Sequence, residues 1–253
     1  MSKRDWNDFR LAGAFLTIFP VLRKRGDAEF KADELARSMA FFPAVGLVLG
    51  LMLVVIDWVL GGLIPRPVLD CLLLLGLIII TGALHLDGIA DLIDGLAGGR
   101  DRAGILRIMK DSRVGAIGAV GLVMVLLLKY LSLFNLPLEI KAAALLLMPA
   151  AGRWMQVVMA VNCPYIRSEG GTGGAFVDNV GERELLIASG TLVLAALILC
   201  GAKGVVFCFL VAGCAWVLMA YFQRRLGGVT GDVLGAATEI TEVFALIALL
   251  ALY

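Results

Sequence analysis

The sequence is poor in net charge, in histidine and in paired cysteines, and each scarcity excludes a class of protein. Its 253 residues carry a formal net charge of only +1, so a basic surface of the kind that binds nucleic acid is not expected. The five cysteines are scattered and show no CxxC or Cys/His spacing, which excludes a zinc or dithiol motif. No glycine-rich segment runs into Gly-Lys-Ser or Gly-Lys-Thr, so a Walker-type nucleotide loop is excluded as well.

Apolar residues, in contrast, are abundant. They make up 60% of the chain, against about 45 to 50% in a soluble domain. We therefore expect an all-α fold, a polytopic integral-membrane bundle that forms one domain over residues 1–253. Seven runs are long enough to approach the roughly 20 residues that a span needs, namely 38–60, 67–85, 115–134, 142–161, 185–200, 205–222 and 234–253. The apolar stretch 9–22 is too short to cross and is expected to lie in the interface or to re-enter the membrane.

The distribution of lysine and arginine predicts the orientation of the bundle. With the N-terminus in the cytoplasm, only Arg66, Lys141 and Lys203 fall in outer loops, and the other basic residues outside the spans all face the cytoplasm. The outer loops are also minimal, whereas the inner loops are long and rich in Gly, Asp and Arg. Any chemistry is therefore expected on the cytoplasmic side, and the C-terminus outside.

Three aspartates follow the second predicted span at helical spacing. Asp87, Asp91 and Asp94 stand at i, i+4 and i+7 and share one face of a helix. Like charges so close repel one another unless cations intervene, and oxygen ligands are those that Mg²⁺ or Mn²⁺ prefers, with phosphate oxygens completing the shell. The pattern predicts a metal site, and the alternative is a solvated polar face at the end of a span.

Two further segments of the inner loops suit phosphate. Lys110 and Arg113 stand at the membrane surface, where they can donate to a phosphate held by a metal, or can simply anchor the protein. The backbone N–H groups of a glycine-rich loop can wrap a phosphate, although a plain turn explains the glycines too. In that loop the predicted substrate contacts are Gly171, Thr172 and Gly173.

Charged residues also occur inside predicted spans, where they are functional candidates by default. Arg153 lies in the middle of a span and either binds an anionic group or pairs with Glu239 or Glu242. Asp232, Glu239 and Glu242 lie near one face of the last span, and the alternative for them is hydrogen bonding between helices in the protonated form.

Taken together, these motifs resemble the cobalamin-5′-phosphate synthase family, also called adenosylcobinamide-GDP ribazoletransferase. The resemblance covers nearly the whole chain, in the family's order and spacing, and departs at no motif position. It rests on His85-Leu86-Asp87-Gly88-x-Ala90-Asp91-x-x-Asp94-Gly95, Asp111-Ser112-Arg113-x-Gly115, Gly170-Gly171-Thr172-Gly173-Gly174 and Gly228-x-Thr230-Gly231-Asp232-x-Leu234-Gly235-Ala236.

The resemblance implies an Mg²⁺-dependent enzyme of the bacterial inner membrane. It would join adenosylcobinamide-GDP to α-ribazole or α-ribazole 5′-phosphate and release GMP. Asp87, Asp91, Asp94 and Asp232 would hold the metal, and Arg113 and Arg153 would contact phosphate oxygens. The base that deprotonates the attacking hydroxyl stays open among His85, an aspartate of the cluster and Glu239, because His85 could instead only orient Asp87.

Two other functions and one question of assembly remain open at this stage. A CDP-alcohol phosphotransferase acting on lipid shares the metal chemistry, although Asp91 stands where that motif has arginine. A secondary transporter would also carry intramembrane carboxylates, but near the midplane and with access from both sides. Besides membrane lipid, a second copy of the chain is a candidate partner, because Gly46-x-x-x-Gly50 can pack helices within or between subunits.

Overall fold

The computed structural model confirms the all-α prediction. It describes residues 3–19, 31–111, 113–166 and 172–253, the side chain of Thr172 excepted. In these residues the regular structure is helical, with one isolated bridge between Tyr165 and Val229. The helices are α1 (Lys3–Leu16), α2 (Ala32–Ser38), a 3₁₀ turn (Met39–Phe41), α3 (Phe42–Leu60), α4 (Arg66–Thr81), α5 (Leu84–Gly98), α6 (Arg102–Ile108), α7 (Ala116–Asn135), α8 (Leu138–Asn162), α9 (Thr172–Val177), α10 (Glu182–Cys200), α11 (Ala202–Leu226) and α12 (Gly231–Leu252).

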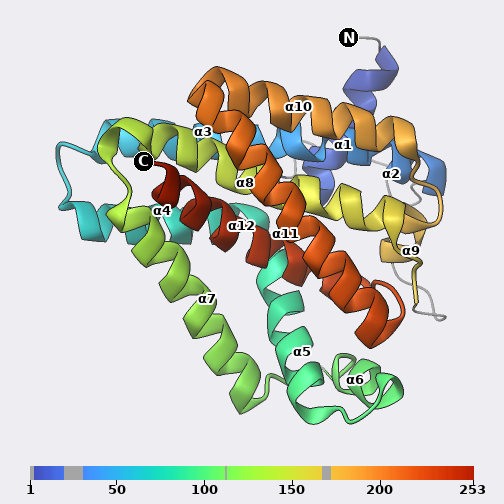
Figure 1. The fold of residues 1–253 in the computed structure, drawn as a ribbon. Helices are drawn as coiled ribbons and strands as arrows, with labels where there is room; N and C mark the ends of the chain where they lie inside the picture. Colours follow the sequence, from blue (N-terminus) through green and yellow to red (C-terminus); the bar gives the residue numbers. More distant parts are fainter. Residues whose placement is uncertain (1–2, 20–30, 112, 167–171) are drawn as a thin grey trace.

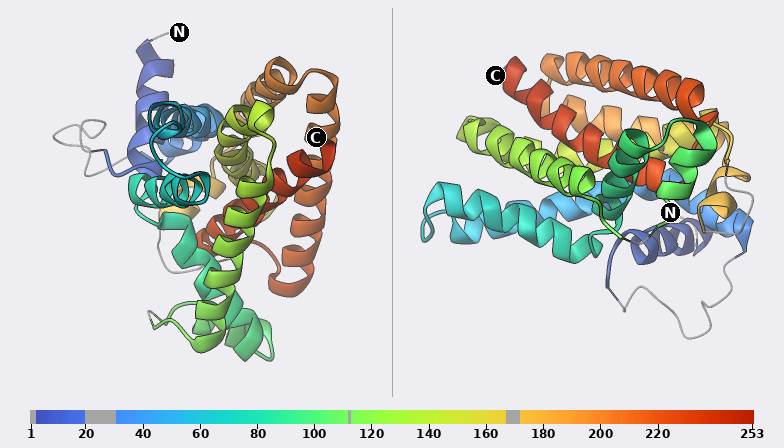
Figure 2. Two further views of the ribbon diagram at one scale, coloured as in Figure 1. Left: turned by 90° about the vertical axis from the view of Figure 1, so that its left-hand side faces the viewer. Right: turned by 90° about the horizontal axis from the view of Figure 1, so that it is seen from below.

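Six helical segments are long and apolar enough to cross a membrane, as expected of a multi-pass membrane protein. They are α2–α3 taken together, α7, α8, α10, α11 and α12. A seventh crossing is formed only if α4 and α5, bent by 93° against each other, count as one broken span. The connections α3–α4, α7–α8 and α10–α11 lie at one end of the bundle with the C-terminus, and α5 and α6 extend away from that end (Figures 1 and 2).

The bend between α4 and α5 corrects the predicted span 67–85. The helix ends at Thr81, and the two residues that follow are both left-handed, Gly82 with φ 63° and Ala83 with φ 55°. Gly82 also packs closely, since an added Cβ would lie 2.9 Å from Cγ2 of Ile18. The N–H of Ile18 donates to the Ile80 carbonyl oxygen at 2.9 Å. Ile18, just after α1, therefore supports the corner, and His85 lies in the first turn of a new helix and not at the end of a span.

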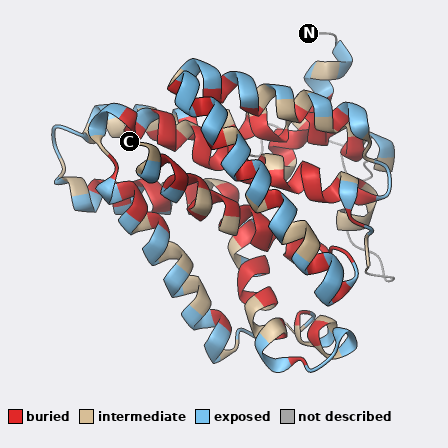
Figure 3. Cartoon of the chain, in the orientation of Figure 1, coloured by how far each residue is buried: buried red, intermediate tan, exposed pale blue. Residues whose placement is uncertain are grey.

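Helices α8 and α12 form the buried centre of the bundle, whereas α7, α10 and α11 keep exposed apolar faces that suit contact with lipid (Figure 3). Helix α3 packs on α8 through Gly46 and Gly50. An added Cβ would lie 2.6 Å from Cα of Ala150 at Gly46 and 2.4 Å from the Leu145 carbonyl oxygen at Gly50. The Gly46-x-x-x-Gly50 pair therefore packs two helices of one chain, and it gives no support to a contact between subunits.

Candidate active site

A cavity of about 230 Å³ opens among α1, the 3₁₀ turn, α3, α5, α8, α9 and α12. Its polar lining residues include His85 and Asp87 from α5, Gln156 from α8 and Asp232 from α12. Its apolar lining includes Phe15, Met39, Phe42 and Phe176. Three of these rings pack on one another, with centroids 4.5 Å apart for Phe15 and Phe176. The cavity therefore offers both polar groups and apolar or aromatic side chains to a ligand.

Small residues bring the two aspartates of this cavity together. At Gly88 of α5 an added Cβ would lie 2.6 Å from the carbonyl oxygen of Asp232, so the two backbones touch there. Gly235 of α12 faces the backbone of His85 in the same way, at 3.3 Å from its Cα. Thr230 caps α12, its Oγ1 accepting from the N–H of Val233 at 3.2 Å. The start of α12 is thus fixed against the start of α5.

Asp87 and Asp232 form a donor set that fits Mg²⁺. This ion is usually held by one or two protein carboxylates while phosphate oxygens and water fill the remaining positions. Over the described ranges, no three or more His, Cys, Asp and Glu side chains gather closely enough to hold a metal by themselves. A metal in this cavity would therefore depend on oxygens of the substrate to complete its shell.

Asp94 has backbone partners on another helix. Its carboxylate oxygens accept from the N–H of Gly115 at 2.6 Å and from the N–H of Gly118 at 2.8 Å, at the start of α7. It lies seven residues after Asp87, about 10 Å along the helix axis at 1.5 Å per residue. Asp91, between them, is half-buried and lies outside the cavity wall. The predicted stripe exists, but it runs from the cavity to α7 and does not converge on one point.

Of the predicted phosphate contacts outside the membrane, Gly173 lines the cavity, Lys110 and Arg113 do not, and the others lie outside the described residues and side chains. Arg113 is 87% exposed and binds Asp111, with Nη2 at 2.6 Å from Oδ2 and Nε at 3.0 Å from Oδ1. These hydrogen bonds lower the pKa of Asp111 to about 2. Lys110 is exposed in the same segment. Gly171 and the side chain of Thr172 lie outside the described residues, whereas Gly173 lines the cavity, packed on the ring of Tyr165.

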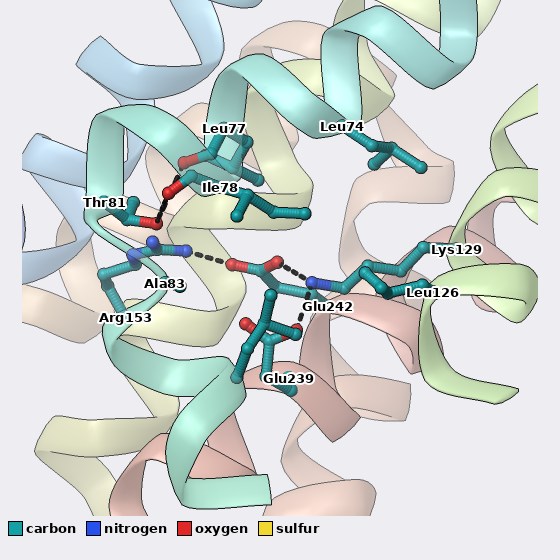
Figure 4. A pocket seen from close by; sticks show the side chains of 11 residues that line it. Leu74, Leu77, Ile78, Thr81, Ala83, Leu126, Lys129, Arg153, Glu239 and Glu242 are labelled. Atoms are coloured by element: carbon teal, nitrogen blue, oxygen red, sulfur yellow. Dashed lines mark hydrogen bonds and ion pairs between the residues drawn. The ribbon is translucent and has the colours of Figure 1, made fainter. Parts of the chain in front are cut away.

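The intramembrane charges form a separate ionic cluster, defined here as Lys129, Arg153, Glu239 and Glu242. Arg153 pairs with Glu242, and the Lys129 amine lies between Glu242 and Glu239, 2.6 Å from the latter (Figure 4). These side chains are at most 7% exposed. Of the two alternatives for Arg153, the structure shows the buried pair with Glu242. Lys129 lies within the predicted span 115–134, but helical spacing does not show that its partners lie on α12.

A series of hydrogen bonds joins the cavity to the centre of the bundle. Gln156 Nε2 lies 2.8 Å from Nε2 of His85 and 2.8 Å from Oγ1 of Thr238. Gln156 is not among the residues that the sequence predicts for the site. The available signal was weak, because a lone amide in an apolar run is as compatible with helix packing as with a site.

Comparisons with known proteins identify relatives of this chain along nearly its whole length. The family model described as Cobalamin-5-phosphate synthase matches residues 8–250. A protein of Geotalea daltonii is 42% identical over 247 residues, 94% of each chain. Proteins of Desulforamulus reducens and Syntrophobacter fumaroxidans are each 38% identical, covering 97% and 98% of this chain and 96% and 100% of their own. All three are named adenosylcobinamide-GDP ribazoletransferase. No solved structure matches the chain.

Proposed function

We propose, since the chain belongs to the cobalamin-5-phosphate synthase family, that the cavity between α5 and α12 is where it carries out its reaction. The reaction class follows from the family: it is the ribazole transfer that assembles the nucleotide loop of cobalamin. The hydroxyl of α-ribazole or its 5′-phosphate attacks the corrinoid-linked phosphorus of adenosylcobinamide-GDP. A new P–O bond forms, the bond to GMP breaks, and the hydroxyl proton passes to a base.

The observation that carries this proposal is the convergence of Asp87 and Asp232 on one cavity. Asp87 is exposed to the cavity, and Asp232 lines the same cavity from α12. We assign these two carboxylates to Mg²⁺. Asp91 and Asp94, which the sequence also predicts as metal ligands, do not line the cavity. The bound ion would neutralise charge on the pyrophosphate and on the departing GMP.

The apolar lining supports the choice of substrates. Both partners of the reaction carry a flat aromatic base, guanine in one and the ribazole base in the other. Phe15, Phe42 and Phe176 line the same cavity as Asp87; Phe15 is half-buried and the other two rings are at most 3% exposed. An aromatic base packed against this apolar lining would lie in the same cavity as the aspartates to which we assign the metal.

For the membrane arrangement we propose the bacterial inner membrane, with the site open to the cytoplasm. The support is the charge distribution, because the basic residues of α6 and of the last turn of α11 belong to the end of the bundle that carries the site. The outer connections are short by comparison. The orientation follows from the tendency of cytoplasmic loops to carry lysine and arginine.

The first test is a turnover assay with the purified full-length chain in detergent or liposomes. It would contain adenosylcobinamide-GDP, α-ribazole phosphate and Mg²⁺, and would follow GMP release and cobalamin product with and without chelator. We expect chelator to stop the reaction. Substituting a CDP-activated lipid for the corrinoid should give no product, and the reverse preference would favour the lipid phosphotransferase.

Asp87→Asn and Asp232→Asn should each lower turnover by at least about 100-fold, the usual cost of removing one group that stabilises charge in a transition state. Glu139→Gln provides the matched control, because Glu139 is an exposed carboxylate in the first turn of α8, near the outer connection. Its turnover should equal that of the parent. A folded Asp87→Asn protein with the parent rate would refute the assignment of this cavity.

A further inference from the structure

Gln156 bridges His85 of the cavity wall and Thr238 of α12, so one amide joins three helices. Its Nε2 lies 2.8 Å from His85 Nε2 and 2.8 Å from Thr238 Oγ1. All three side chains are buried, with exposed fractions of 4% for Gln156, 5% for His85 and 0% for Thr238. A buried polar group that lost its partner would be costly, so each hydrogen in the bridge from His85 through Gln156 to Thr238 has to be accounted for.

The hydrogens can be assigned from Thr238 outward. Its hydroxyl donates to the carbonyl oxygen of Leu234 at 2.9 Å. A hydroxyl has a single hydrogen, and with that hydrogen directed to Leu234 the Oγ1 of Thr238 accepts from Gln156. The group of Gln156 that faces Thr238 is therefore the NH₂, and one of its two hydrogens is used there. The other is directed to Nε2 of His85, which must present a lone pair to receive it.

A neutral imidazole carries its proton on one nitrogen and a lone pair on the other. With the Nε2 lone pair engaged by Gln156, the proton of His85 lies on Nδ1. Neither nitrogen is then available to take a proton from a substrate hydroxyl, since one is already accepting and the other is already protonated. The remaining capacity of the ring is to donate from Nδ1.

We infer that Gln156 is a positioning residue that holds His85 in the Nδ1–H form, so that His85 donates a hydrogen bond to an anionic oxygen of the substrate and does not act as the general base. The part that concerns substrate rests on the proposed function, whereas the state of the ring does not. Of the bases considered from the sequence, an aspartate of the cluster of Asp87, Asp91 and Asp94, or Glu239, would remain. Glu239 is 5% exposed and held by Lys129, which leaves the aspartates of the cluster as the better candidates.

The single histidine of the chain allows a direct test. Full-length protein labelled with ¹⁵N-histidine and reconstituted in lipid gives one pair of ring nitrogen signals. We expect Nε2 to resonate as an unprotonated nitrogen and Nδ1 as a protonated one. Gln156→Met, which keeps the length and removes the donor, should mix the two forms. Gln223→Met is the matched control, because Gln223 is exposed on α11 and donates to Asn162. A proton on Nε2 in the parent protein would overturn the inference.

Turnover of two His85 variants tests the role in the reaction. The amide N–H of asparagine reaches roughly the position of Nδ1–H but has no basic nitrogen. Loss of a general base costs about 10² to 10⁴-fold, and His85→Asn and His85→Ala would lose it equally. If His85 acts as a hydrogen-bond donor, His85→Asn should instead keep at least about tenfold more turnover than His85→Ala. One hydrogen bond to a charged group contributes roughly this factor. Equal losses would overturn the donor role. A parent protein that does not turn over the corrinoid would refute the proposed function. The position of the proton on the His85 ring would then still be tested by the ¹⁵N spectrum.

Discussion

Asp94 and Asp87 belong to one predicted stripe, yet they have different surroundings. The exposed carboxylate of Asp87 faces the cavity, whereas that of Asp94 accepts two backbone hydrogen bonds from the first turn of α7. An acceptor at this place satisfies N–H groups that the helix leaves unpaired and meets the positive end of its dipole. Helical spacing predicted their common face correctly, but the partner helix is invisible in that spacing.

Gly118→Ala tests the capping role without altering Asp94. The added Cβ would lie 2.3 Å from Oδ2 of Asp94 and 2.8 Å from the Ala90 carbonyl oxygen, so the carboxylate, and with it the α5 backbone, must move away from α7. We expect the free energy of unfolding to fall by about 0.5 to 2 kcal/mol, the cost of a lost helix cap. Thermal unfolding in detergent measures it, with Gly213→Ala as control, since a Cβ there meets nothing within 4 Å. An unchanged transition in Gly118→Ala would contradict the capping role.

Among the helices, the corner between α4 and α5 matters most for the site. Residues 67–85 read as one apolar run because no proline interrupts them. The break depends on two left-handed residues, and Ala83 adopts this conformation although it has a Cβ, at a cost of about 1 to 2 kcal/mol. Contacts with Ile18 support the corner from another part of the chain. A local pattern could not reveal a turn that distant residues hold in place.

The packing of α3 on α8 gives a second prediction for the helices. Gly50→Ala places a Cβ 2.4 Å from the Leu145 carbonyl oxygen, and the two backbones must separate to admit it. We expect destabilisation of about 1 to 3 kcal/mol, the usual cost of overpacking, and a lower unfolding temperature in detergent. Gly213→Ala again serves as control and should be neutral or slightly stabilising, because alanine favours the helix. Equal unfolding temperatures for the two variants would mean that the close approach is not required.

Across the whole molecule, the ionic cluster of Lys129, Arg153, Glu239 and Glu242 joins α7, α8 and α12 at the buried centre. Its two positive and two negative charges balance. Lys129→Met should cost about 3 to 5 kcal/mol of stability, because it leaves a buried negative charge without its partner. The double variant Lys129→Met/Glu239→Gln restores the balance and should recover most of the loss. The measurement is the unfolding of the parent, of Lys129→Met and of the double variant in one detergent. A double variant no more stable than Lys129→Met would contradict the predicted charge balance.

The composition and the length of the apolar runs were enough to predict a multi-pass helical protein, because a membrane imposes helix length and internal hydrogen bonding directly on the sequence. The motifs were enough to predict the family, and the comparisons confirm it. His85, Asp87, Asp232 and Gly173 were predicted as site residues, and all four line one cavity.

The remaining assignments depend on contacts between segments far apart in the chain. The cap formed by Asp94, the pair of Arg153 with Glu242 and the bridge through Gln156 each require a partner on another helix. Periodicity reports which face of its own helix a residue occupies, but not which helix packs against that face. That choice is made by close packing at small residues such as Gly50 and Gly88, where the approach of two backbones decides which polar groups meet.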